Sequence, residues 1–234
     1  MRKGFCLFIV FGLVGLMCGC ELGTTALSES DISDDYNEEV KKSLRKLIST
    51  GNCEECPLMG VDISGKDLNH KDLSRANLTG AILTGANLSR ADLNGADLRN
   101  ADLSKADLSR ASLVHAIFTG ASLTRANLTG ANLTGANLSR ASLVHAKFAG
   151  ADFGGANLSR ANLFKANLPE ANLTGANLTE ADLFKTNLSN ADLKGANLTG
   201  ADLKGANMKN IRNLDSAIKC KTIFSWGEDN SGCK

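Results

Sequence analysis

The chain has 234 residues, with 26 Lys and Arg against 25 Asp and Glu, so its formal net charge is only +1. This balance excludes a protein that binds nucleic acid through its bulk charge. Hydrophobic residues make up 43% of the chain but aromatic residues only 5%. The apolar content is therefore mostly Ala and Leu, which favours a thin, repetitive core, and the length allows one domain or two.

The N-terminus has the pattern of an export signal. A positive start at Arg2 and Lys3 precedes an apolar run, 5–17, that is too short to span a bilayer. The run ends in Gly19-Cys20, which resembles a bacterial lipobox. We therefore expect a signal peptide at 1–19 and a lipid attached to Cys20, the alternative being an ordinary cleaved signal with an incidental cysteine.

The next pattern is a strict five-residue repeat. From Ile63 to Met208 an apolar residue, usually Leu, recurs at every fifth position for thirty consecutive units. Two positions earlier stands Ala in 26 of the 27 units between Ala76 and Ala206, the exception being Thr186. Asn or Asp usually lies between the two, and Gly is common at the last position of a unit.

A period of five fits neither a helix nor a single long strand. On a helix each five-residue step turns about 140°, which spreads the Leu residues around the cylinder. On a strand an odd period points successive Leu residues to opposite faces. The pattern works if each unit is a short extended piece followed by a corner, with Ala and Leu pointing inward. The chain is then expected to coil around a narrow apolar interior.

These units resemble the pentapeptide-repeat family, whose consensus Ala-(Asn/Asp)-Leu-X-X is met almost throughout residues 61–210. The resemblance implies an all-β solenoid, a right-handed quadrilateral β-helix with four units, or twenty residues, in each coil. It also implies a rod in which each coil contacts only its neighbours.

Both ends of the expected rod have candidate caps. After a linker at 20–34, Ser33 or Asp34 is expected to cap a helix at about 35–49, and 35–60 forms an N-terminal α-helical cap with a Cys-X-X-Cys motif. Asn210 departs from the repeat, so 211–234 is expected to form a C-terminal cap over a sheet edge that would otherwise aggregate.

Four cysteines remain once the signal and Cys20 are set aside. An even number in an exported protein favours two disulfides. In the expected fold the two pairs lie at opposite ends of the rod, too far apart for a shared zinc site. We therefore expect two local disulfides, made by these residues: Cys53 with Cys56, and Cys220 with Cys233.

The sequence offers no catalytic constellation. Its three histidines fall on three different faces of the expected coil, and no Ser or Thr has an activating partner. We expect no enzyme, no cofactor and no metal site. Some members of the family are acidic DNA mimics that bind topoisomerases, and this is the alternative function. Residues 61–210 instead hold 16 Lys and Arg against 13 Asp and Glu, the wrong sign for a mimic.

Residues twenty apart should stack along the rod, which predicts one candidate partner-binding face. The last positions of successive units form a basic ladder: Lys105, Arg125, His145, Lys165 and Lys185. The neighbouring column forms an apolar strip: Val144, Phe164 and Phe184. An apolar strip beside a cationic one has the composition of an interface. We expect it to bind an acidic protein or a second copy of the rod, while a lipid anchor holds the protein at the membrane of the cell envelope and nucleic acid is not a partner. The alternative is a twenty-residue duplication whose rings merely pack on each other.

Overall fold

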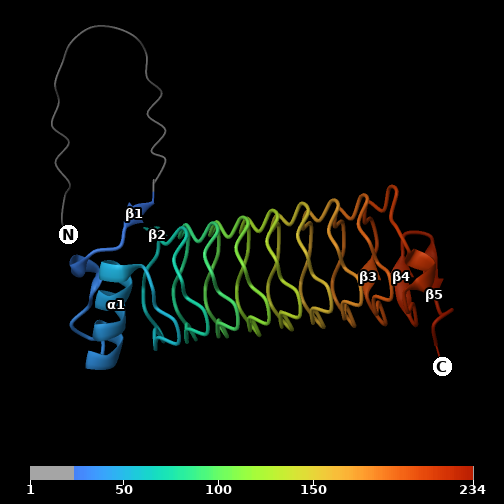
Figure 1. Ribbon diagram of the computed structural model, residues 1–234. Helices are drawn as coiled ribbons and strands as arrows, with labels where there is room; N and C mark the ends of the chain where they lie inside the picture. Colours follow the sequence, from blue (N-terminus) through green and yellow to red (C-terminus); the bar gives the residue numbers. More distant parts are fainter. Residues whose placement is uncertain (1–23, 234) are drawn as a thin grey trace, which may run out of the picture.

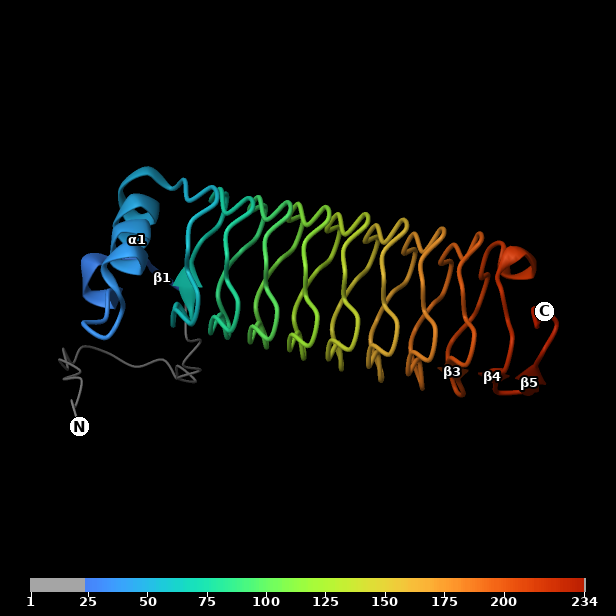
Figure 2. The same cartoon turned by 90° about the horizontal axis from the view of Figure 1, so that it is seen from below.

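The computed structural model describes residues 24–233 as a long rod of stacked coils (Figures 1 and 2). The helix α1, Glu38–Thr50, lies at one end of the rod, and the strands β4, Thr222–Phe224, and β5, Gly227–Asp229, lie at the other. The predicted signal peptide and Cys20 lie outside the described residues. Within them, no helix is both long enough and apolar enough to cross a membrane.

The coils are joined by parallel pairing between residues twenty apart. Asp72 pairs with Asp92, for example, and Asn132 with Asp152. Pairs of this kind follow one another along the sides of the rod, and usually only one residue of each five-residue unit takes part. Because the paired segments are so short, longer strands occur only near the ends, as in β2, Lys66–Asp67, and β3, Asp202–Leu203. The predicted period of twenty residues per coil is therefore present in the structure.

The interior consists of the Ala and Leu columns predicted from the repeat. These side chains are at most 1% exposed from Ala76 to Leu203, and the aromatic rings of Phe118, Phe148 and Phe153 replace Leu in the middle of the rod. Thr186, which interrupts the Ala column, is also fully buried. Its hydroxyl donates a hydrogen bond of 2.9 Å to the carbonyl of Leu163 one coil back, so the buried polar atom is satisfied.

The corners explain the last position of each unit. Every fifth residue from Glu55 to Asn210 has a positive φ, between 54° and 71°. From Ile63 to Met208 the carbonyl of each inward residue accepts the amide three residues on, as between Leu73 and Ala76 at 3.1 Å. This is the requirement of a type II turn, which Gly meets without strain. The Asn or Asp before the Leu often accepts the first amide of the turn, as Asn77 does from Thr79 at 3.1 Å.

The β-helix begins earlier than the predicted boundary at residue 61. Asn52 already pairs with Asp72, and Pro57 pairs with Asn77. Cys53 and Leu58 occupy the inward Leu position and are completely buried. Leu58 stands five residues before Ile63 and so continues the repeat, while at position 53 a buried cysteine replaces Leu.

The helix α1 starts later than predicted. Asn37, rather than Ser33 or Asp34, is the N-cap, and its side-chain oxygen accepts the amide of Val40 at 2.9 Å. Gly51 ends the helix with a φ of 71°. Three side chains of the helix, those of Val40, Leu44 and Leu47, are buried and continuous with the interior of the rod.

The described part of the predicted linker, 24–34, contains two short elements instead of being irregular throughout. Strand β1, Thr25–Ala26, pairs in parallel with β2, and the short 3₁₀ helix η1, Glu29–Asp31, follows it. Asp31 forms an ion pair of 2.7 Å with Lys66 in the first coils. These residues join the sheet because β1 supplies the backbone partner that Lys66–Asp67 would otherwise lack on that side.

The C-terminal segment continues the coil instead of interrupting it at Asn210. Arg212 still pairs with Asp192, twenty residues away, whereas Ile218 pairs with Asn197, twenty-one residues away. The 3₁₀ helix η2, Leu214–Ser216, lies between these two pairs and absorbs the extra residue. Strand β4 then pairs in parallel with β3 and antiparallel with β5, so 211–234 contains a further stretch of coil closed by a hairpin.

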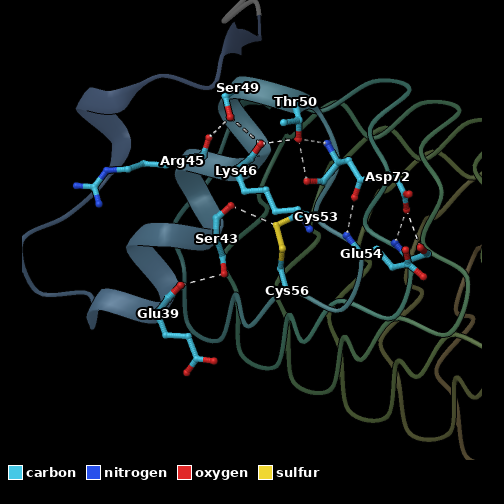
Figure 3. Close-up of a disulfide and its surroundings, with 12 residues drawn as sticks. Glu39, Ser43, Arg45, Lys46, Ser49, Thr50, Cys53, Glu54, Cys56 and Asp72 are labelled. Atoms are coloured by element: carbon cyan, nitrogen blue, oxygen red, sulfur yellow. Dashed lines mark hydrogen bonds between the residues drawn. A yellow bond between two sulfur atoms is a disulfide. The ribbon is translucent and has the colours of Figure 1, made fainter.

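A disulfide links the cysteines at each end, in the pairs expected. Cys53–Cys56 lies in the first coil beneath α1, where the Cys53 sulfur also contacts the carbonyl oxygen of Ser43 at 3.2 Å (Figure 3). Cys220–Cys233 joins the start of β4 to the segment after β5.

Candidate interaction face

The candidate face is built on the coil sides whose inward residues include Leu143, Leu163 and Leu183. Backbone bonds fix the stacking of its columns: the amide of His145 donates to the carbonyl of Phe164 at 3.1 Å, and the amide of Lys165 donates to that of Phe184 at 3.0 Å. The ladder and the strip therefore lie side by side, one residue of each per coil.

The part of the face nearer the C-terminal end of the rod is an ordered cluster of rings and cations. The rings of Phe164 and Phe184 are stacked, with centroids 5.9 Å apart and an interplanar angle of 10°. His145 meets the edge of Phe164 at 6.0 Å. The ammonium groups of Lys165 and Lys185 each lie 5.1 Å from the centroid of the preceding ring, within the range of a cation–π interaction.

Both Phe side chains are half-buried, whereas the two lysines are exposed. The rings thus gain part of their burial from each other and keep an outward edge. Lys105 and Arg125 are also exposed, and they occupy the column of the two lysines nearer the N-terminal end of the rod. Val144 is half-buried in the coil before that of Phe164. The structure brings His145, Phe164 and Phe184 into contact, but Lys105 and Arg125 do not reach the ring cluster.

A shallow groove of about 450 Å³ runs beside the rings, and it contains acidic residues that the sequence analysis did not single out. Its lining comprises Phe164 and Phe184 together with Glu180, Ala181, Asp182, Gly200 and Asp202. The signal was present in the sequence, because Asp182 and Asp202 are also twenty residues apart on the same face. The apolar strip therefore has carboxylates on one side and lysines on the other.

The carboxylates of the groove already have partners. Glu180 forms an ion pair with Arg160 at 2.7 Å. Asp182 accepts the amide of Phe184 at 2.9 Å, and Asp202 accepts that of Lys204 at the same distance. Lys165 and Lys185 have no carboxylate within 4.0 Å among residues 24–233. The lysines therefore present unpaired ammonium groups on one side of the strip, and Asp182 and Asp202 keep their negative charge on the other.

No group of three or more His, Cys, Asp or Glu residues in the described part of the chain is placed to hold a metal ion. The histidines His70, His115 and His145 lie at three different corners of the coil. The chemistry that this surface can offer is binding, through apolar edges, cation–π pairs and exposed ammonium groups.

The coils and their stacked outer columns define a β-helical repeat protein. The family profile described as Pentapeptide repeats matches eight overlapping copies, which together run from residue 56 to residue 212. The chain therefore belongs to the pentapeptide repeat family, and this membership implies that its β-helix is right-handed.

Solved structures of other family members resemble the chain. HetL, a pentapeptide repeat protein involved in heterocyst differentiation regulation in the cyanobacterium Nostoc sp. strain PCC 7120, is 34% identical, with 76% of this chain and 90% of HetL covered and a TM-score of 0.52. A pentapeptide repeat protein of the Arabidopsis thaliana thylakoid lumen is 37% identical, covering 44% of this chain and 68% of its own, with a TM-score of 0.35.

A third similar structure is that of full-length QnrB1, a plasmid-mediated fluoroquinolone resistance protein. It is 22% identical and covers 70% of this chain and 88% of its own, with a TM-score of 0.30. No curated protein matches the chain.

Proposed function

We propose that this protein is a non-enzymatic interaction rod of the bacterial cell envelope, which binds a protein partner through the ladder and the strip. The observation that carries the proposal is the ring cluster, in which two phenylalanines stand at outward positions that Ser or Thr fills in most other units. Half-exposed rings beside unpaired ammonium groups have the composition of an interface centre rather than of a solvated surface.

The charge of the face indicates the chemistry of the partner. The ladder presents a column of cations, and neighbouring coils are about 4.8 Å apart. An acidic surface would complement the ladder, while the apolar strip would pack against an aliphatic or aromatic side chain. A second copy of the rod is the alternative occupant. A DNA-mimicking function requires a net negative rod, whereas residues 61–210 carry 16 basic against 13 acidic side chains.

The structure of the two ends favours binding of a partner along the sides of the rod. We propose that α1 and the β4–β5 hairpin are caps, since each lies across a terminal coil whose backbone groups would otherwise be free to pair with another chain. The Cys220–Cys233 disulfide closes the segment around the hairpin, and Cys53–Cys56 closes a turn of the first coil directly after α1. With both ends covered, the exposed columns along the rod are the surface available to a partner.

The test of the binding proposal is a fourfold variant: Phe164→Thr, Phe184→Thr, Lys165→Gly and Lys185→Gly. Glycine suits the positive φ of 54° and 57° at the two lysine positions, so the coil should remain folded. We expect quantitative cross-linking in intact envelopes to lose the partner bound by the wild type. The matched control, Lys194→Thr with Lys209→Thr, removes the same charge elsewhere and should retain it. A folded fourfold variant that still captures the partner would refute the proposal.

Anchoring is a separate proposal, based on the Gly19-Cys20 sequence at the end of the signal-like segment. We expect Cys20 to carry a lipid that holds the rod at the membrane. A radiolabelled fatty acid should enter the wild-type protein and not Cys20→Ser. Equal labelling of both proteins would exclude lipidation at this residue and leave a secreted or periplasmic protein.

A further inference from the structure

A second polar groove lies on a different corner of the rod, near the α1 end. Its volume is about 450 Å³, and Asn, Ser, Thr, Arg and His side chains line it without any carboxylate. Two columns supply the residues that matter here. The cationic column is His70, Arg90 and Arg110, and the hydroxyl column is Ser89, Ser109 and Thr129.

The backbone fixes these two columns side by side. The amide of Arg90 donates to the carbonyl of Ser109 at 2.9 Å, and the amide of Arg110 donates to that of Thr129 at 2.9 Å. Successive members of each column are one coil apart, about 4.8 Å. Above Arg110 the same corner continues with Gly130, where an added Cβ would lie 3.6 Å from the Arg110 Cγ. This distance is an ordinary van der Waals contact, so the Arg110 side chain extends toward the next corner of its own column.

Two corner arginines of the rod have counter-ions, whereas Arg90 and Arg110, like Arg125 and Arg140, have none in the described part of the chain. Arg75 lies 3.2 Å from Glu55, one coil away, and Arg160 lies 2.7 Å from Glu180, one coil away. Within residues 24–233, no carboxylate comes within 4.0 Å of Arg90 or Arg110.

Both Arg90 and Arg110 also stand at positions of positive φ, 57° and 58°, where glycine would be unstrained. Two like charges one coil apart repel each other even in water. An anion bound between them would replace this repulsion with attraction. The groove thus combines unpaired cations, hydroxyl groups and space on one surface.

We propose that this groove binds a phosphoryl group, either as free phosphate or as a phosphate ester. The planar guanidinium group forms paired hydrogen bonds to phosphate oxygens, and two such groups one coil apart can contact the same anion. The hydroxyls of Ser89 and Ser109 supply further donors to the remaining oxygens, whereas that of Thr129 already donates to Asn127 at 2.7 Å. The proposal uses a different corner from the ladder and does not depend on the proposed partner-binding function.

The test is an NMR titration of the folded mature protein with inorganic phosphate, with sodium chloride added to keep the ionic strength constant. The side-chain Nε–Hε signals of Arg90 and Arg110 should shift and saturate. The double variant Arg90→Gln and Arg110→Gln should bind about tenfold more weakly or worse, because charge-assisted hydrogen bonds are lost. A thermal unfolding curve like that of the wild type would establish that this variant is folded.

The charge-matched control is Lys194→Gln with Lys209→Gln, which removes two exposed cations near the β4–β5 end of the rod and should leave phosphate affinity unchanged. Equal weakening by both double variants would show binding to net charge alone and would overturn the proposal, as would shifts that never saturate. Glycerol phosphate distinguishes the two sources. Tighter binding than that of inorganic phosphate supports an ester as the ligand, and equal binding supports the free anion.

Discussion

Replacing Phe148 by alanine should lower the free energy of unfolding by about 3–5 kcal/mol, the range for a large buried aromatic side chain. Phe148 has no exposed surface, and its ring lies 5.1 Å from that of Phe153. The narrow interior has backbone on all four sides, so the coil has little freedom to collapse into the space left by the ring. Urea unfolding followed by circular dichroism measures the change.

The matched control for this substitution is Phe164→Ala on the outside of the same rod. Its ring is half-exposed and packs mainly on Phe184, so we expect a loss of about 1 kcal/mol. Similar losses from the two substitutions would contradict the division into inward and outward positions on which the account of the fold and of the interaction face depends.

Deleting residues 121–140 should shorten the rod by one coil and leave it folded. Residue 141 would take the place of residue 121, so inward residues would stay inward and the outer columns would remain aligned. Removing only Ser139 should be far more damaging, because the missing residue shifts every later unit by one position relative to the coils before it. Inward and outward residues would then no longer stack on residues of the same kind. We expect the twenty-residue deletion to unfold cooperatively at a melting temperature near that of the wild type. The single deletion should lose most of the native far-ultraviolet circular dichroism signal.

A contrary result is easy to recognise. If the single deletion were tolerated as well as the deletion of a whole coil, the five-residue spacing would not be what holds the inward columns in place. The natural chain does accommodate one extra residue, between Arg212 and Ile218, but it does so at the last coil with η2 in place of a tight corner. In the middle of the rod, a coil has to keep its register with both the preceding and the following coil.

The interior could be predicted from the sequence because each inward residue is specified by its position in the unit. Ala and Leu recur without an insertion for thirty units, and the structure buries them as expected. The first coil escaped prediction because Cys53 stands where the repeat has Leu and because Leu58, although in register, is preceded by Cys56 and Pro57 in place of Ala and Asn or Asp. The start of α1 escaped it because Ser33, Asp34 and Asn37 are all good N-caps, and only tertiary packing selects among them.

The candidate site was predictable to the extent that it depends on stacking. The twenty-residue spacing was enough to align Phe164 with Phe184 and Lys165 with Lys185, and the structure places each pair in adjacent coils. The position of each lysine over a ring depends on side-chain torsions that spacing does not determine. The acidic side of the groove was overlooked, since Asp182 and Asp202 also read as ordinary members of the repeat.

The most direct test of the proposed function is site-specific photo-cross-linking in intact cells. A photoreactive phenylalanine analogue replaces Phe184 in one strain and Thr174, two units earlier and therefore on the opposite side of the coil, in another. Both positions are half-buried corner residues, so the two proteins should be equally well folded. Our account predicts a discrete cross-linked species from position 184 that is absent from position 174. An equally strong cross-link from position 174, or none from position 184, would contradict it.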